Sequence, residues 1–373
     1  KGKASFEMGT VPLQMDFSVG EYAGGKAFPI FIRGRLPSEH LDIAFSGLAT
    51  SQSTARIDGT AKLTLADAAA PDTPVLVAEA GLVMDRRGAE IRKLSALSGD
   101  TRLTGGGRVE FGGLPQIILD LDARQFDARP LIKAVLPKAA PSAAPFTAWL
   151  DVQLPNWVRG RFSLDADGLQ LPTRRFEDVV LSLKARTNSL DIEQATATLP
   201  GETRVSLRGE LRRESAFEQS FNGDFQLHAG DIARLSAWMI DPATEGDAAA
   251  AGGPFSARMK VALDPSLLQV YDLEAAYAET LEEPDLQGGF SYAQRGGQPV
   301  LVADLTGTQL DMRPLMESWP LRRRDLTRLL SDVDLSLILD TDLVRLPHLD
   351  LGDMELRANA HRGRALSVEK LTV

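Results

Sequence analysis

Apolar and polar residues alternate along most of this chain, in short runs separated by turn residues. A period of two places successive side chains on opposite faces of a β-strand. The pattern therefore predicts a mainly β fold of antiparallel strands, each with one apolar and one hydrated face. The clearest predicted strands are Leu41–Phe45, Ile57–Leu65, Leu103–Phe111, Phe162–Ala166, Val179–Ala185, Val205–Leu211, Phe255–Leu263 and Leu335–Leu339.

One phrase occurs three times, each time after an alternating run: Asp127-Ala-Arg-Pro-Leu131, Asp231-Ile-Ala-Arg-Leu235 and Asp311-Met-Arg-Pro-Leu315. Such self-similarity indicates a repeat protein, and approximate repeat units are 31–136, 149–240, 255–320 and 333–373, the last incomplete. The alternate positions four to ten residues before each Asp are mostly apolar or small. Their bulky members are candidates for the lining of an apolar surface: Ile117, Leu119, Leu121, Phe221, Phe225, Leu227, Leu301 and Leu305.

A short helical stretch follows each repeated Asp. The predicted helices cover Arg129–Ala134, Ile232–Met239 and Arg313–Trp319. Because Asp is favoured at the N-cap, and because no second carboxylate recurs beside it, the three Asp residues are interpreted as helix caps rather than ligands. The Leu that closes each phrase is expected to face the sheet.

A chain of 373 residues usually forms two or three domains, but no stretch here changes character sharply. We therefore expect one continuous repeat-built β-fragment over residues 1–373. The chain begins at Lys1 without Met and ends inside an alternating run, which favours a piece of a longer protein. Ala- and Pro-rich stretches at Asp67–Pro74, Pro137–Pro145 and Asp241–Pro254 are expected to be exposed loops.

Composition excludes several classes of function. The net charge of −10 argues against a nucleic-acid partner, which calls for clustered Lys and Arg. The only basic run, Arg322–Arg324, lies beside Asp325 and is interpreted as a solvated helix face. The absence of Cys excludes disulfides, thiol nucleophiles and Cys-ligated metals.

No arrangement of residues predicts an enzyme, a metal site or a cofactor. The four histidines, His40, His228, His348 and His361, are scattered and are interpreted as surface residues. Gly105–Gly107 lacks the Lys-Ser or Lys-Thr of a phosphate loop and indicates a β-bulge. Glu282 and Glu283 are adjacent, precede a Pro and are expected to be loop charges rather than a glycosidase pair.

The repeated unit of strand, Asp phrase and helix resembles the AsmA family of Gram-negative envelope proteins. Two lead-in phrases carry the same resemblance, Leu97-Ser-Gly-Asp-Thr-Arg-Leu103 and Leu199-Pro-Gly-Glu-Thr-Arg-Val205, as do Gly-initiated strands such as Gly107–Phe111. The resemblance extends from about Phe31 to Val373. It implies an elongated, twisted, open β-sheet groove of the bridge-like lipid-transfer group. It also implies a periplasmic protein, anchored to the inner membrane, that carries phospholipid toward the outer membrane, although the N-terminal anchor helix of that family is not in this sequence.

Two functions remain open at this point. The first is phospholipid transport, in which acyl chains contact an accessible apolar face and the membranes are reached through other parts of the parent protein. The second is a non-catalytic envelope scaffold that binds other envelope proteins. Alternating residues also line the dry core of any β-sandwich or solenoid, so periodicity does not decide between an open groove and a sealed core.

Overall fold

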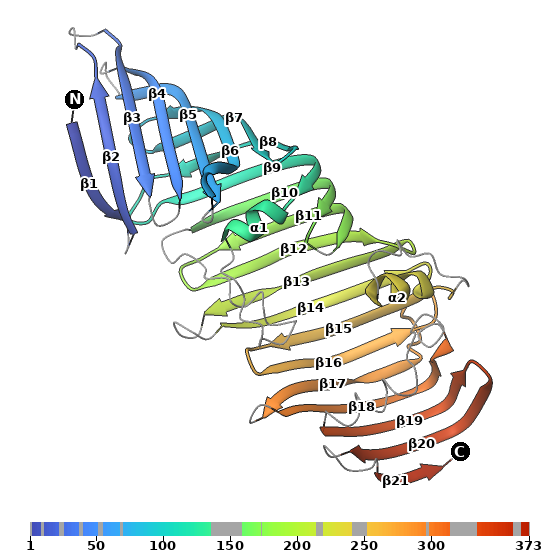
Figure 1. The fold of residues 1–373 in the computed structure, drawn as a ribbon. Coiled ribbons are helices and arrows are strands. Elements are labelled where there is room, and N and C mark those ends of the chain that lie inside the picture. Colours follow the sequence, from blue (N-terminus) through green and yellow to red (C-terminus); the bar gives the residue numbers. More distant parts are fainter. Residues whose placement is uncertain are drawn as a thin grey trace. The chain divides into compact units, whose positions relative to one another are not determined.

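The computed structural model describes residues 2–8, 11–21, 26–36, 40–50, 55–67, 70–135, 159–172, 174–213, 219–240, 252–295, 298–313, 334–360 and 367–372. This part of the protein is mainly β, as the alternating pattern predicted, with two helices among many strands (Figure 1). No helix in these ranges is both long and apolar enough to span a membrane.

The strands of the first half are β1 (Gly2–Met8), β2 (Val11–Val19), β3 (Phe28–Leu36), β4 (Leu41–Thr50), β5 (Arg56–Asp67), β6 (Ala70–Met84), β7 (Gly88–Ser98), β8 (Thr101–Glu110), β9 (Gln116–Asp127), β10 (Arg159–Gln170) and β11 (Arg175–Ala185). Those of the second half are β12 (Ser189–Leu199), β13 (Thr203–Arg213), β14 (Gln219–Ala229), β15 (Phe255–Leu263), β16 (Leu267–Ala276), β17 (Leu286–Arg295), β18 (Gln298–Asp311), β19 (Asp334–Leu346), β20 (Leu349–Ala360) and β21 (Ser367–Thr372). Helix α1 (Arg129–Val135) follows β9, and helix α2 (Ile232–Ile240) follows β14.

The chain divides into two compact units. Unit 1 comprises Lys1–Ala143 and Asp151–Glu193, and unit 2 comprises Ala144–Leu150 and Gln194–Val373. Strand β12 contains the division. The repeat units predicted from the sequence begin and end at residues outside this strand, and they stay a prediction.

In unit 1 each strand from β1 to β11 pairs with the next along the chain. The first and last of these strands do not pair with each other, so the sheet is open. Its strands twist strongly, and β1–β5 run at a steep angle to β8–β11 (Figure 1). A twist of this kind is the normal result of the handedness of L-residues in strands.

In unit 2 the strands from β13 to β21 also pair in chain order and form an open sheet. All pairings described in the two units are antiparallel, with two exceptions. Strands β9 and β10 are parallel, as are β18 and β19. Both parallel pairs are joined by long connections, because a chain that continues in the same direction must first return to the start of its neighbour.

The repeated Asp residues cap the helices, as the sequence predicted. In each copy the Asp Oδ1 accepts a hydrogen bond at 3.0 Å from the backbone N–H two residues later, on Arg129, Ala233 or Arg313. The predicted helices after Asp127 and Asp231 are therefore confirmed. For the third, Arg313 is helical and residues 314–320 lie outside the described ranges, as does the basic run 322–324.

The first and third caps share a further contact, because the guanidinium two residues later pairs with the capping carboxylate. In the first copy Arg129 Nη2 lies 2.7 Å from Asp127 Oδ2, and the hydrogen bond from this side chain lowers the pKa of Asp127. In the third copy Arg313 pairs with Asp311 in the same way. Burial works against ionisation of Asp311, but the hydrogen bonds and charge of Arg313 outweigh it and lower its pKa. In the second copy Asp231 Oδ1 instead accepts three backbone hydrogen bonds. The donors are the N–H groups of Ala233, Arg234 and Gly252, the last at 2.9 Å.

Two local expectations require correction. The stretch Asp67–Pro74 is not an exposed loop throughout, because β5 reaches Asp67 and β6 begins at Ala70. The bulge expected at Gly105–Gly107 lies in the partner strand: the register shifts between Ile91 and Leu94 of β7, where Lys93 has a φ of 50°. The glycines themselves continue β8, and the extra residue occurs opposite them.

Candidate functional site

Cross-strand registers place one apolar face on the sheet of unit 1. Residues that are directly opposite in neighbouring strands point to the same side of a sheet. From β3 to β11, the central positions on one side are aliphatic, aromatic or glycine, and none is charged. One row of this face, followed strand by strand, is Ile32, Phe45, Ala61, Ala80, and a second is Leu103, Ala123, Ala166, Val179.

The sheet of unit 2 has an apolar face of the same kind. Charged residues in the register of this face occur only at strand ends. Its central positions from β13 to β18 are Val205, Leu207, Gly209, Leu211, Leu227, Phe225, Gly223, Phe221, Ala257, Met259, Val261, Leu263, Ala275, Leu273, Val270, Leu268, Leu286, Gly288, Phe290, Tyr292, Gly307, Leu305, Ala303 and Leu301. The hydroxyl of Tyr292 is the main polar group among them.

The opposite face of each sheet, here called the polar face, carries the charges. Cross-strand ion pairs recur on it, including Arg35–Asp42 at 2.8 Å, Lys62–Glu79 at 3.0 Å and Lys260–Asp272 at 2.7 Å. Their side chains are about half exposed, so each pair contributes little to stability. Their effect is to make the two faces chemically different, because a sheet whose charges are confined to one side leaves the other free for apolar contacts.

In each unit the described strands belong to one open sheet, and no second sheet of that unit lies over its apolar face. This arrangement differs from a β-sandwich, in which two sheets face each other. The helices do pack on the protein. Helix α1 lies against β5 and β6, and Ala233, Leu235 and Trp238 of α2 are 2–6% exposed.

Side chains on the apolar face of unit 1 nevertheless shield one another. All the buried apolar strand residues of this unit lie on the apolar face, among them Phe45, Leu103 and Leu164 at 5–7% exposed. Toward β2 the face opens, where Phe17 is 42% exposed and Val19 is 48% exposed. The apolar face therefore combines packed positions with accessible ones.

A recurring aromatic–glycine contact contributes to the burial of two phenylalanines. Phe221 lies over the paired glycines Gly209 and Gly223, where an added Cβ would come within 2.8 and 2.6 Å of the ring. Phe45 covers the Gly47–Gly59 pair of unit 1 in the same way, at 2.7 Å for both. A ring laid on two glycines recovers the contacts that those residues lack. Phe221 is only 3% exposed, so other groups of the protein cover the ring as well.

All eight residues predicted as lining lie on the apolar faces. In unit 1, Ile117, Leu119 and Leu121 face the small residues of β8 and are half-buried. In unit 2, Phe225, Leu227 and Leu301 are also half-buried. Phe221 and Leu305 pack against other side chains of the protein. Phe221 is buried, and Leu305 contacts two buried clusters, one around Leu286 and one around Leu339.

The sequence-based prediction did not include several accessible residues of the apolar face of unit 1. Phe17 and Val19 of β2 and Ile43 of β4 belong to the apolar face of unit 1 and are each more than a third exposed. The alternation of Phe17 and Val19 was available in the sequence, but these strands lack the Asp phrase on which the prediction was based. Alternation alone, followed through every run, would have found them.

The His and Glu residues considered as metal ligands or catalytic groups form no such site in the described part of the chain. No group of three or more His, Asp and Glu side chains in the described ranges is arranged to hold a metal. His228 is half-buried, and its Nδ1 lies 3.0 Å from Ser256 Oγ, so it is not a surface residue as expected. His348 is exposed, and His361 lies outside the described ranges. Glu282 and Glu283 are exposed in the β16–β17 connection, as predicted.

Comparison with known proteins finds no counterpart: no family model, no curated protein and no solved structure matches this chain.

Proposed function

We propose that this protein binds phospholipid through the apolar faces of its sheets and transports it between membranes. The observation that carries the proposal is an apolar face without central charges, on an open sheet that no second described sheet covers. Apolar surface that is left uncovered destabilises a protein in water unless a ligand or partner covers it. An amphiphile with long alkyl chains is the simplest ligand for such a face.

The energetics support this role. A phospholipid with roughly 30 methylenes would cost on the order of 20 kcal/mol to expose to water, at about 0.8 kcal/mol per CH₂. An apolar face offsets most of this cost. Half of a ~30 Å hydrocarbon core, about 15 Å, is the length of one acyl chain, and a ten-residue strand spans about 33 Å. A chain therefore fits within the width of the sheet.

The side chains of the apolar faces favour movement of lipid along the sheet over tight binding at one position. They are aliphatic, aromatic or absent, and central polar groups that would fix a headgroup are rare. Contacts of this type are non-directional and scale with area, so they hold acyl chains without selecting one position. We propose accordingly that the protein is not an enzyme and that the chains slide along the face.

We propose, from the resemblance of the sequence to the AsmA family, that this activity takes place in the bacterial envelope. On that proposal the protein lies in the periplasm, is anchored to the inner membrane through other parts of its parent chain, and contributes to outer-membrane lipid homeostasis. The motifs that carry the resemblance correspond to structural features here, since both lead-in phrases form tight turns at Gly99 and Gly201, with φ of 59° and 76°.

A scaffold that binds other envelope proteins is the alternative, and the close packing of Phe221 and Leu305 favours it. Native mass spectrometry with lipid extraction separates the two functions when combined with photo-crosslinking from positions 121 and 225. Matched controls are the adjacent polar-face positions Asp122 and Gln226, both exposed. Phospholipid crosslinked at 121 and 225 but not at 122 and 226 is the expected result. A lipid-free protein that also refuses added phospholipid would favour the scaffold.

A further inference from the structure

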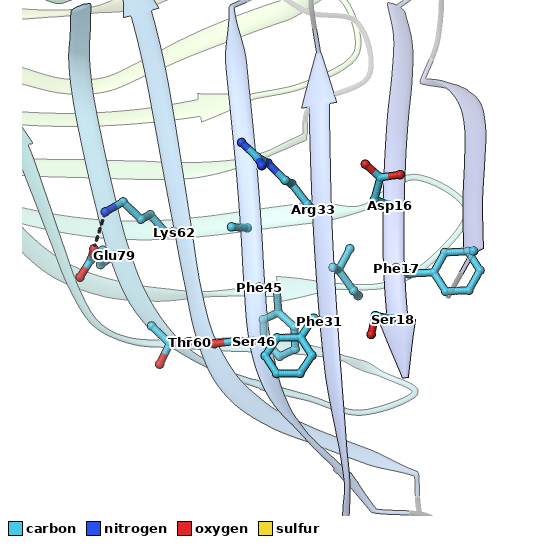
Figure 2. A pocket seen from close by; sticks show the side chains of 13 residues that line it. Asp16, Phe17, Ser18, Phe31, Arg33, Phe45, Ser46, Thr60, Lys62 and Glu79 are labelled. Carbon is cyan, nitrogen blue, oxygen red and sulfur yellow. Dashed lines mark ion pairs between the residues drawn. The ribbon is translucent and has the colours of Figure 1, made fainter. Parts of the chain in front are cut away.

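The polar face of unit 1 contains a hollow that the proposed transport does not use. It lies over strands β2 to β6 and has a volume of ≈ 930 Å³ (Figure 2). Sites for small molecules have volumes of about 300–1,000 Å³ and combine apolar surface with a few placed polar groups. Most residues around this hollow point away from the apolar face, although Phe17, Ile32 and Phe45 of that face also contribute to its lining.

A row of small hydroxyl residues surrounds an exposed aromatic ring in this hollow. Ser18, Phe31, Ser46 and Thr60 are directly opposite one another in β2, β3, β4 and β5. Phe31 is 54% exposed, although the rest of its row is polar. Its neighbours are too short to cover the ring, which leaves an apolar platform open to a ligand.

The adjacent row carries an unpaired cation. It consists of Asp16, Arg33, Ala44, Lys62 and Glu79 in β2 to β6. Lys62 pairs with Glu79 at 3.0 Å. Figure 2 shows the Arg33 guanidinium and the Asp16 carboxylate pointing apart. No carboxylate of the described residues pairs with Arg33, whose other neighbour in the row is the methyl group of Ala44.

Arg35 provides the contrast. It lies two residues further along β3 on the same face, and its Nε donates to Asp42 Oδ1 at 2.8 Å. The two arginines of this strand thus differ in their pairing: Arg35 has an anionic partner, and Arg33 has none among the residues that the structure describes. A planar guanidinium binds carboxylate and phosphate through two parallel hydrogen bonds, so Arg33 presents a fork for an external anion.

We propose that this hollow binds an anionic amphiphile, whose carboxylate or phosphate pairs with the Arg33 guanidinium while its apolar body packs on the Phe31 ring. Among the described residues of the hollow, Arg33 is the cation without an ion pair, and it matches one anionic group. The alternate residues Arg33 and Phe31 are about 7 Å apart along the strand, which is the separation between the head of such a molecule and the first part of its tail. The ligand class follows from these two contacts together.

Isothermal titration calorimetry with octanoate, octyl phosphate and neutral octanol tests the proposal. Octanoate or octyl phosphate is expected to bind saturably, and octanol about tenfold more weakly, since a hydrogen bond to a charged group is worth roughly a factor of ten. The headgroup that binds more tightly identifies the source of the anion. Acetate and inorganic phosphate, which have no tail, are expected to bind more weakly than the octyl compounds.

Matched variants locate the site. Arg33→Gln is expected to weaken binding of the octyl anions about tenfold, to the level of octanol, whereas Arg35→Gln leaves it unchanged. Phe31→Ser weakens all octyl ligands alike and still folds, because the ring is more than half exposed. Circular dichroism checks that all three variants are folded.

Several results would overturn the proposal. These are equal losses in Arg33→Gln and Arg35→Gln, equal affinity for octanol and the octyl anions, equal affinity for the tailless anions, or no saturable binding at all. A substitution on the apolar face, Leu121→Asp, is expected to leave this binding intact. The effect of Leu121→Asp on phospholipid transport is measured in a separate assay. Phospholipid transport and binding of the anionic amphiphile can therefore fail independently of each other.

Discussion

Replacing Leu121 with Asp perturbs the apolar face at an accessible position. Leu121 is half-buried in the middle of β9, opposite Gly105 of β8 and Leu164 of β10. The adjacent residue, Asp122, is exposed on the polar face of the same strand. A carboxylate at position 121 therefore tests one face while the strand, its hydrogen bonds and its neighbours stay the same.

The expected cost in stability follows from partial burial. A fully buried Leu contributes about 1.5–3 kcal/mol, so a half-buried one contributes roughly 1–1.5 kcal/mol. The new carboxylate can reach water, because the side chain at position 121 is only half-buried, and the total loss should stay at about 2 kcal/mol. In a sealed core the same substitution would exceed about 4 kcal/mol, because the charge would be buried without a partner.

Urea unfolding followed by circular dichroism measures this loss, and transfer of fluorescent phospholipid between vesicles measures function. Leu121→Asp is expected to fold and to block transfer, since acyl chains must then pass a hydrated charge. Leu164→Asp, at a residue only 5% exposed, is the control for a packed position and should lose much more stability. Equal destabilisation by both substitutions, or undiminished transfer by Leu121→Asp, would show that the reasoning is wrong.

Three further predictions concern the framework. Phe221→Ala uncovers the glycine pair beneath its ring and should cost about 3–5 kcal/mol in urea unfolding. Gly47→Ala should destabilise markedly, because its Cβ would lie 2.4 Å from a backbone carbonyl oxygen, whereas Gly81→Ala, with 3.5 Å to the nearest atom, should not; similar unfolding midpoints would contradict this. The lowered pKa of Asp311 stabilises the fold above its unfolded-state pKa near 3.8, and this contribution disappears as the pH falls through the folded-state value. Asp311→Asn should therefore flatten the acid limb of the stability–pH curve between about pH 5 and 2, with Arg313→Gln acting in the same direction.

Local patterns in the sequence predicted many elements correctly. Strands such as Ile57–Leu65 and Phe255–Leu263 were found because alternation has the period of the strand itself. The two helices after Asp127 and Asp231 were found because an N-cap depends on contacts within a few residues. The loop expected over Asp67–Pro74 was wrong, because Pro is tolerated near the start of a strand and at bulges, and the first residues of β6 pair with β5 through two register shifts.

The three copies of the Asp phrase do not lead to one topology. The connections after Asp127 and Asp311 return the chain to a parallel neighbour, whereas that after Asp231 leads to the antiparallel β15. The phrase specifies a cap and a helical turn. The direction of the next strand depends on the path of a long connection, which the phrase does not contain.

For the apolar face, alternation along the chain determined which residues share a side of each strand, and all eight predicted lining residues lie on that side. Only the tertiary structure decided which of them are covered. Phe221 lies over two glycines from different strands and is buried, whereas Leu121, with only a glycine opposite it on β8, is half-buried. The same holds for Arg33 and Arg35, which alternate on one face of the same strand but differ in whether a described carboxylate pairs with them across the sheet. Alternation is a property of consecutive residues, whereas burial and ion pairing depend on strands that are distant in the chain and are brought together by register and twist.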